Sequence, residues 1–329
     1  MGIKGYKAFG KGLICNPDGV AKQYKEHTTF EEDGDVNLGP CRKGVMHFCE
    51  DPFDILGRYP LFNSDGEITE IAEVEAVGDV RNFGDQSITN KLHIGAKLNF
   101  KGFVKACVDF TIEKTKFEID KDSDSDINSG NSAQIGSSGD SAKIGSSGDY
   151  AQIGSSGDFA QIGSSGDSAQ IGSSGDSAKI GSSGNSAQIG SSGDSAKIGS
   201  SGDYAQIGSS GDSAKIGSSG DYAQIGSSGD FAQIGSSGDS AKIGSSGDYA
   251  QITSEGKNSV VMAAGFDSMA KAKIGSWITL AEWVRVNDDD KTIWKPKCVK
   301  TEYVDGEKIK EDTFYKLIDG EFKEVKEND

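Results

Sequence analysis

The sequence predicts a mainly β protein: a β-solenoid with two nine-residue units per 18-residue coil, flanked by a small α+β N-terminal domain and a C-terminal β-meander. Three observations predict this architecture. The chain repeats every nine residues from Asn131 to Ile252, apolar residues alternate within each unit, and the repeat stops on both sides. We therefore expect three domains, at residues 1–128, 129–252 and 253–329.

The repeated unit reads [Asp/Asn]-[Ser/Tyr/Phe]-Ala-[Gln/Lys]-Ile-Gly-Ser-Ser-Gly and occurs in fourteen copies. Ala and Ile lie two positions apart, which is the spacing of one face of a strand, so both should face the interior. The two variable positions should then face outward from the same strand. The Gly-Ser-Ser-Gly-Asp stretch has no apolar residue and is typical of a turn.

Glycine and serine at this density are also typical of flexible linkers. A flexible linker, however, would not require isoleucine at the same position of all fourteen units. The regularity therefore favours a solenoid, whose stability depends on continuous stacking of neighbouring coils and on capped ends.

The Gln/Lys position indicates how the units are arranged. Four lysines fall in even-numbered units and would share one basic face, which makes them candidate partner-binding residues: Lys143, Lys179, Lys197 and Lys215. The fifth, Lys242, falls in an odd-numbered unit. Two faces with different chemistry are expected from two units per coil, whereas a triangular coil of three units predicts no such alternation.

Six units carry an aromatic residue before Ala, and all six carry Gln at the next variable position. Outward aromatic residues on a solenoid are candidate contact points for a partner. These candidates are Tyr150, Phe159, Tyr204, Tyr222, Phe231 and Tyr249. The alternative is that unit variants were duplicated by recombination and have no role in binding.

Calcium is one ligand to consider, because toxin-type β-rolls also use nonapeptides and hold calcium at their turns. In those repeats the large apolar residue follows Asp by two places, but here it follows by four, and Asn131 and Asn185 replace Asp. The pattern favours Asp as a local turn former. Cys41, His47 and Cys49 lack a Cys-x-x-Cys pair, so we expect free thiols and no bound metal.

The N-terminal flank has the mixed pattern of a globular domain. Residues 13–15, 45–49 and 68–80 are typical of strands, and residues 98–108 indicate a helix. Asp51 followed by proline predicts a capped short helix over residues 51–56.

The C-terminal flank begins with a degraded unit that is expected to cap the solenoid with a larger core. Residues 270–283 then alternate as a strand. Two Asp-Gly pairs, Asp305-Gly306 and Asp319-Gly320, predict hairpins, the first between residues 301–303 and 308–309 and the second between residues 315–317 and 321–322.

Three segments of the flanks resemble an uncharacterised protein family that is common in phages and prophages of gut bacteria. The segments are Tyr6-Lys-Ala-Phe9, the run from Gly44 through His-Phe-Cys-Glu-Asp-Pro-Phe to Asp54, and Gly275-Ser-Trp-Ile-Thr-Leu-Ala-Glu-Trp283. The resemblance implies no particular activity. A phage origin would favour defence evasion, host takeover or a role on the virion surface.

The chain offers little evidence of catalysis. The stretch from Gly44 to Glu50 is similar to a strand of ADP-ribosyltransferases, which would make Arg42, His47 and Glu75 the candidate site of a divergent enzyme. No second motif of that family is placed convincingly. The sequence also contains no phosphate-binding loop, dinucleotide fingerprint or nucleophile motif, so we expect neither an enzyme nor a cofactor.

Charge limits the kind of partner. The formal net charge is -17, and no segment is basic, so direct binding to nucleic acid is not expected. No membrane span or signal peptide is evident, which favours the cytoplasm of a host cell. We therefore predict a non-catalytic phage protein that binds and inhibits or decoys a host protein, for example a defence nuclease or a CRISPR component. The alternative non-enzymatic role is a spike of a virion or cell surface, and homo-oligomers through the globular flanks remain open.

Overall fold

A computed structural model describes residues 2–15, 21–38, 44–61, 69–115, 125–128, 130–288 and 291–325. It confirms a mainly β protein with a β-solenoid between strand-rich flanks. The chain divides into two compact units, Met1–Phe110 and Thr111–Asp329, which we describe separately. No helix among the described residues is long and apolar enough to cross a membrane.

The N-terminal unit contains a four-stranded antiparallel sheet in the order β1-β6-β9-β4, a three-stranded sheet β5-β8-β7 and the pair β2-β3. Its strands are β1 (Ile3–Phe9), β2 (Ile14–Cys15), β3 (Lys22–Gln23), β4 (Thr28–Glu31), β5 (Met46–Phe48), β6 (Glu70–Ala76), β7 (Val80–Asn82), β8 (Ser87–Thr89) and β9 (Lys91–Leu98). A 3₁₀ turn covers Val36–Leu38. The core includes Phe9, Phe48, Val74, Leu92 and Ile94.

Both helices predicted in this region are present. Helix α1 (Pro52–Arg58) begins with the predicted cap, because the Asp51 carboxylate accepts a hydrogen bond from the Phe53 N–H at 2.9 Å. Helix α2 (Phe100–Thr115) starts two residues later than expected, since Leu98 is the last residue of β9. The Asn99 side chain caps α2 by accepting a hydrogen bond from the Gly102 N–H.

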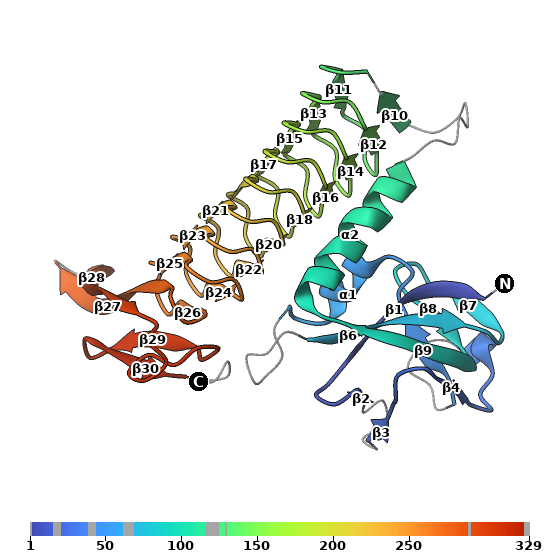
Figure 1. Cartoon of the computed structure of the whole chain (residues 1–329), viewed down its shortest axis with the longest axis horizontal. Coiled ribbons are helices and arrows are strands. Elements are labelled where there is room, and N and C mark those ends of the chain that lie inside the picture. Colours follow the sequence, from blue (N-terminus) through green and yellow to red (C-terminus); the bar gives the residue numbers. More distant parts are fainter. Residues whose placement is uncertain are drawn as a thin grey trace. The chain divides into compact units, whose positions relative to one another are not determined.

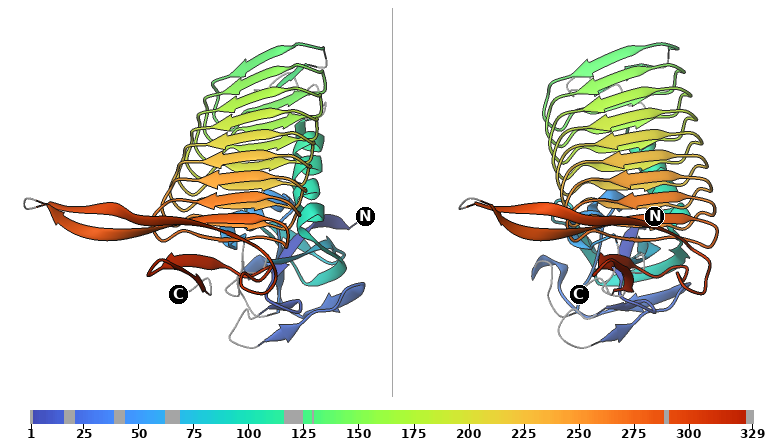
Figure 2. Two further views of the ribbon diagram at one scale, coloured as in Figure 1. Left: turned by 60° about the vertical axis from the view of Figure 1, so that its left-hand side comes forward. Right: turned by 90° about the vertical axis from the view of Figure 1, so that its left-hand side faces the viewer.

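The solenoid consists of two parallel sheets whose strands alternate along the chain (Figures 1 and 2). The odd sheet contains β11 (Gln134–Ser137), β13 (Gln152–Ser155), β15 (Gln170–Ser173), β17 (Gln188–Ser191), β19 (Gln206–Ser209), β21 (Gln224–Ser227), β23 (Lys242–Ser245), β25 (Val260–Ala263), β27 (Trp277–Asp288) and β28 (Lys291–Tyr303). The even sheet contains β10 (Ser125–Asn128), β12 (Lys143–Ser146), β14 (Gln161–Ser164), β16 (Lys179–Ser182), β18 (Lys197–Ser200), β20 (Lys215–Ser218), β22 (Gln233–Ser236), β24 (Gln251–Ser254), β26 (Met269–Lys271), β29 (Tyr315–Ile318) and β30 (Glu321–Glu324). In-register pairs such as Ile171↔Ile189 and Ile180↔Ile198 confirm two units per 18-residue coil.

The strand occupies a different part of the unit from the one predicted. We expected it to run from the Ser/Tyr/Phe position to Ile, but it runs from Gln/Lys to the first Ser of Gly-Ser-Ser-Gly. The reason is that the Ser/Tyr/Phe position has a left-handed φ of +56° to +60° in every unit, which is incompatible with an extended strand. Ala, Ile and the first Ser face the interior, while Gln/Lys and the strand glycine face outward.

The turn glycine and the strand glycine of a unit differ in the space that surrounds them. At Gly193, in the turn after β17, an added Cβ would collide with the backbone carbonyl of Gly175 in the preceding coil. At Gly190, within β17, an added Cβ would meet nothing within 4 Å. The turn glycine therefore permits the coils to stack closely, whereas the strand glycine of the odd sheet is not required by the fold.

The parallel ladder continues beyond the exact repeats. In β25 and β27, Val261, Ala263, Ile278 and Leu280 take the inward positions that Ile and Ser occupy earlier. Strand β27 then pairs antiparallel with β28, and β29 pairs antiparallel with β26 and β30. The ladder of each sheet thus ends in antiparallel strands at its C-terminal side, and Figure 2 shows the β27–β28 ribbon extending outward from the last coils.

One of the two predicted hairpins is present. Asp319-Gly320 joins β29 to β30 with positive φ at both residues, as expected of this turn. The hairpin predicted at Asp305-Gly306 is wrong, because Tyr303 is already paired with Trp277 in the β27–β28 ribbon. The Asp305 carboxylate instead accepts hydrogen bonds from the N–H groups of residues 307–309 and closes a local turn.

The two glycines of one unit provide a matched test of coil stacking. Gly193→Ala should lower the free energy of unfolding by about 2 kcal/mol or more, because the backbone must move to relieve the collision. Gly190→Ala should change it by less than about 1 kcal/mol, because space is free and the unfolded chain loses entropy. Urea denaturation followed by circular dichroism measures both; equal effects would contradict the assignment.

Candidate functional site

Each turn of the solenoid carries one Asp or Asn, and these side chains connect successive coils. In all fourteen units Oδ1 accepts a hydrogen bond from the backbone N–H 18 residues further on, at 2.7–3.2 Å. Asn131 and Asn185 make the same bond as Asp. We expected Asp to shape its own turn; the structure corrects this, because the donor it reaches lies in the next coil.

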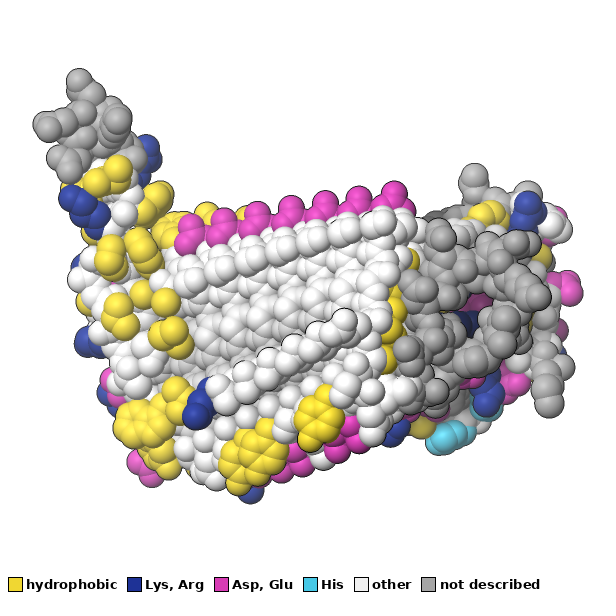
Figure 3. Space-filling view, turned by 90° about the horizontal axis from the view of Figure 1, so that it is seen from above, with side chains coloured by type: hydrophobic (Ala, Val, Ile, Leu, Met, Phe, Trp, Pro, Cys, Tyr) yellow, Lys and Arg dark blue, Asp and Glu magenta, His cyan; other side chains and the backbone are white. Residues whose placement is uncertain are grey.

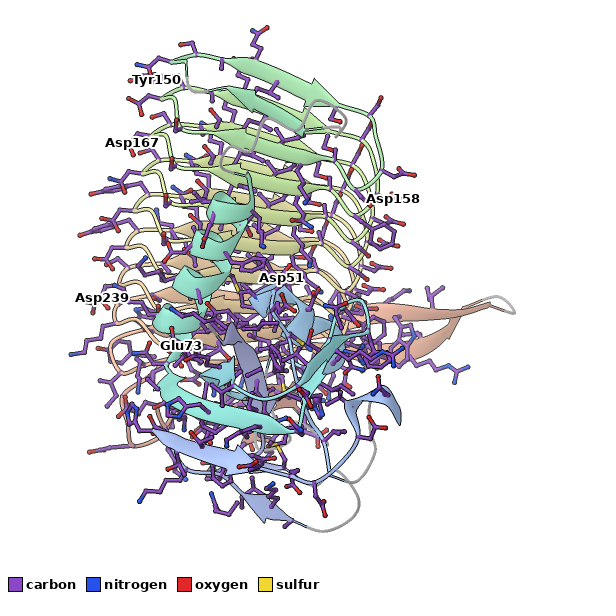
Figure 4. All side chains as sticks on the ribbon, turned by 90° about the vertical axis from the view of Figure 1, so that its right-hand side faces the viewer. Asp51, Glu73, Tyr150, Asp158, Asp167 and Asp239 are labelled. Carbon is purple, nitrogen blue, oxygen red and sulfur yellow. The ribbon has the colours of Figure 1, made fainter. Side chains whose placement is uncertain are left out.

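The turns form two lines of side chains along the solenoid. Corner A precedes the odd strands and contains Asn131, Asp149, Asp167, Asn185, Asp203, Asp221 and Asp239. Corner B precedes the even strands and contains Asp140, Asp158, Asp176, Asp194, Asp212, Asp230 and Asp248. In Figure 4, Asp158 of corner B lies on the opposite edge from Asp167 and Asp239 of corner A. Among the described residues, no group of three His, Cys, Asp or Glu is placed to hold a metal ion.

The six aromatic candidates follow these carboxylates directly at the corners. Tyr150, Tyr204 and Tyr222 lie on corner A, and Phe159, Phe231 and Tyr249 lie on corner B. They are between 43% and 64% exposed. The aromatic residues therefore project from the turns and not, as we expected, from the outer surface of the strands.

Neighbouring aromatic residues stack where successive coils both carry one. The rings of Tyr204 and Tyr222 lie 5.1 Å apart with an interplanar angle of 5°, and those of Phe231 and Tyr249 lie 5.0 Å apart at 4°. Each residue also donates its N–H to the carbonyl of the next coil, as Tyr222 does to Asp239. The left-handed backbone and, in these two pairs, the stacking thus restrict the movement of the rings.

The ring contacts on corner B continue beyond the exact repeats, to residues that the repeat pattern does not identify. On corner B, Tyr249 is followed by Phe266 in an edge-to-face contact, and Phe266 contacts Trp294 of β28 at 4.3 Å between ring centroids. Phe266 lies 18 residues after Asp248 and donates its N–H to the Asp248 carboxylate. It therefore takes the position of the Asp column, while Asp267 takes the left-handed position that the aromatic residues occupy in earlier coils, so extending the aromatic register by 18 residues would not have identified it.

The lysine candidates lie on the even sheet. Register pairs Lys179↔Lys197 and Lys197↔Lys215 place three of them side by side, with Lys143 two strands earlier and Lys242 on the odd sheet. Burial and the adjacent Lys197 ammonium lower the pKa of Lys215 to about 8. The four residues thus share one face, as their spacing predicts.

The N-terminal unit has a pocket of its own, lined by Phe9, Ile14, Cys15, His47 and Tyr59, among others. The His47 ring shares a hydrogen bond of 3.1 Å with the Tyr59 hydroxyl, and the Lys7 ammonium donates to the His47 carbonyl oxygen. The charge of Lys7, burial and Arg58 lower the pKa of His47 to about 3, so its ring is neutral at pH 7. Burial raises the pKa of the Cys15 thiol.

The three residues of the transferase hypothesis do not assemble in the described structure. Arg42 lies outside the described residues, as does Cys41 of the zinc alternative. Glu75 lies on β6 opposite Lys4 and His93, whereas the partner of the His47 ring is Tyr59. Cys49 is buried, which raises the pKa of its thiol to about 12.

Comparison with known families gives one match. Residues 3–106 match a family described as a domain of unknown function (DUF7666). The match includes the segments at Tyr6–Phe9 and Gly44–Asp54 but not the repeats or Gly275–Trp283. The N-terminal region is therefore a domain of an uncharacterised family. Neither the curated proteins nor the solved structures include a significant match.

The inter-coil hydrogen bond can be tested at Asp194, whose Oδ1 accepts from the Asp212 N–H at 2.8 Å. Asp194→Ala should lower the free energy of unfolding by about 1 kcal/mol, because the N–H loses its partner. Asp194→Asn should be neutral or slightly stabilising, because Asn makes the same bond at Asn185 and removes one charge from the line. Urea denaturation of both variants checks this, and an Asn variant as unstable as the Ala variant would contradict it.

Protonation of His47 should destabilise the N-terminal unit in acid. Its folded pKa of about 3 lies below the ordinary value of 6.5, so the unfolded chain binds the proton first as the pH falls. Between pH 7 and pH 5 the unit should lose about 2 kcal/mol of stability. Calorimetric unfolding at both pH values should show a smaller loss in His47→Gln; equal losses would place the effect elsewhere.

Proposed function

We propose that this chain is a non-catalytic interaction protein whose solenoid corners bind a host protein with a basic surface. One observation carries the proposal: at both corners, exposed and pre-stacked aromatic rings stand directly beside a line of carboxylates. Aromatic side chains supply much of the binding energy at protein interfaces. Rings that are already held by stacking lose little freedom on binding.

The carboxylate lines favour a basic partner. Residues 129–252 carry 12 Asp and 5 Lys, and the lysines lie on the sheets while the Asp side chains lie at the corners. Coils repeat about every 4.8 Å, so two corners that both hold Asp present one carboxylate per about 2.4 Å of axis. Duplex DNA presents one charge per about 1.7 Å. The linear density of negative charge along the solenoid is therefore comparable to that of duplex DNA, and a protein that binds the phosphate backbone could bind the solenoid instead.

This resemblance supports a decoy of a nucleic-acid-binding protein, such as a defence nuclease or a CRISPR component. The similarity of three flanking segments to phage proteins supports an infected host cell, and its cytoplasm, as the setting. The N-terminal domain would position the solenoid or recruit a further component. The proposal assigns no reaction to the chain and requires no cofactor.

Paired substitutions separate the aromatic and the charge contributions. Tyr204→Ser with Tyr222→Ser should weaken binding at least tenfold, because the stack is lost while Ser occupies this position in eight of the fourteen units at the same φ. Asp203→Asn with Asp221→Asn keeps the inter-coil hydrogen bonds and removes two charges. It should weaken binding mainly at low salt.

The partner is first captured from lysate of the host on immobilised full-length protein, identified, purified and then titrated with each variant. Competition by duplex DNA for the same partner would support the decoy mechanism. A partner that binds both paired variants as tightly as the wild type, or that DNA does not displace, would contradict the proposal.

A further inference from the structure

The outer surface of the odd sheet, which we call the odd face, contains an open groove that none of the functions above uses. Its floor is the column of strand glycines from Gly136 to Gly226, repeating every 18 residues. One wall is the column of Gln side chains from Gln134 to Gln224, and the other edge is formed by serines. Figure 3 shows this face as a mostly uncharged surface with a shallow hollow between raised ridges, acidic side chains along both long edges and a basic side chain near the end where hydrophobic side chains gather.

No steric contact requires glycine on the floor of the groove. No strand glycine from Gly136 to Gly226 has a positive φ, and an added Cβ would meet nothing within 4 Å. Further along the same column, Met262 and Thr279 stand in register with Gly244, so the sheet accepts larger side chains there. Glycine weakens a strand, and in a strand it often marks a site that a ligand or another backbone approaches closely.

The Gln side chains that form the wall of the groove can hydrogen-bond to hydroxyl groups of a ligand. Six Gln amides repeat about every 4.8 Å along the column, and each offers both donors and acceptors. A hydroxyl group also donates and accepts, so it can use both parts of each amide. No charged side chain occurs in this column before Lys242.

The C-terminal end of the groove is apolar. The Gln column continues through Lys242 and Val260 to Trp277, which pairs with Tyr303 across the β27–β28 ribbon. Val260, Met262, Trp277 and Tyr303 are 42–49% exposed, and the Trp277 and Tyr303 rings lie 5.1 Å apart. Met262 and Val260 belong to the lining of the groove, so the apolar end lies in the same groove as the amide wall, with Lys242 between the two.

We propose that this groove binds a neutral, linear polysaccharide. A sugar ring has polar edges for the amides and apolar faces for aromatic side chains, and an extended chain of rings matches a long groove with a flat floor. The acidic corners on both sides would repel polyanions, which disfavours nucleic acid and acidic glycans. A second copy of this chain would bring the same acidic corners against them. This inference does not rest on the proposed protein-binding function, since it uses a different surface.

Isothermal titration calorimetry of the full-length protein with four hexasaccharides tests whether the groove binds a polysaccharide. The hexasaccharides are those of β-1,4-linked glucose, α-1,4-linked glucose, β-1,4-linked N-acetylglucosamine and the anionic α-1,4-linked galacturonate. At least one neutral oligomer should bind, and the anionic one should not. Gly190→Thr with Gly208→Thr, which fills the floor with a good strand former, should weaken binding at least tenfold. Gln188→Glu with Gln206→Glu provides an independent variant that alters the wall without adding bulk, and it should weaken binding as well.

Tyr204→Ser with Tyr222→Ser is the matched control and should bind the oligosaccharide as the wild type does. This control distinguishes failure of the groove from failure of the corner-binding function. Absence of binding to all three neutral oligomers at millimolar concentration would overturn the proposal. So would preferential binding of galacturonate, or wild-type affinity in a folded floor variant.

Discussion

In-register stacking of 18-residue coils is the constraint on which the rest of this structure depends. Each coil is bonded to the next by the strand ladder and, at both corners, by an Asp or Asn side chain that reaches one coil forward. Close stacking explains the turn glycine, because Gly193 and its equivalents approach the backbone of the preceding coil. It also explains a left-handed residue in every unit, since its N–H must point to the carbonyl of the next coil.

Stacking aligns each position of the unit in a column along the solenoid. This alignment brings like charges close together, and it also creates extended surfaces of one residue type. Columns of Asp place like charges about 4.8 Å apart, which is unfavourable, yet each carboxylate gains a charge-assisted bond to a backbone N–H. Asn131 and Asn185 keep the inter-coil hydrogen bond and, being neutral, reduce the repulsion between carboxylates of the column. Because equivalent residues of successive coils align, each column forms an extended surface. Adjacent aromatic residues stack, the glutamines form a row of amides, and the strand glycines of the odd sheet form the floor of the groove.

The surfaces of the solenoid therefore differ in chemistry although they share one repeat. The corners combine negative charge with aromatic rings, the even sheet carries four lysines, and the odd face is uncharged up to Lys242, which precedes the apolar end at Trp277 and Tyr303. The antiparallel strands β28, β29 and β30 end the parallel ladders on the C-terminal side, so β28 and β30 are the edge strands there. The N-terminal unit is a separate body with its own core, its own pocket and a neutral His47.

By itself the sequence determined the solenoid, the number of units per coil and which lysines share a sheet, because a nine-residue period and the phase of Lys and Gln are visible without coordinates. It also determined the α1 cap and the Asp319-Gly320 hairpin, which are local devices. Only the tertiary structure decided where the strand lies in the unit, what Asp binds, that the aromatic residues sit at corners and that Tyr303 pairs with Trp277. These features arise from contacts between residues 17 or more positions apart, and a local pattern of apolar and polar residues carries no information about them.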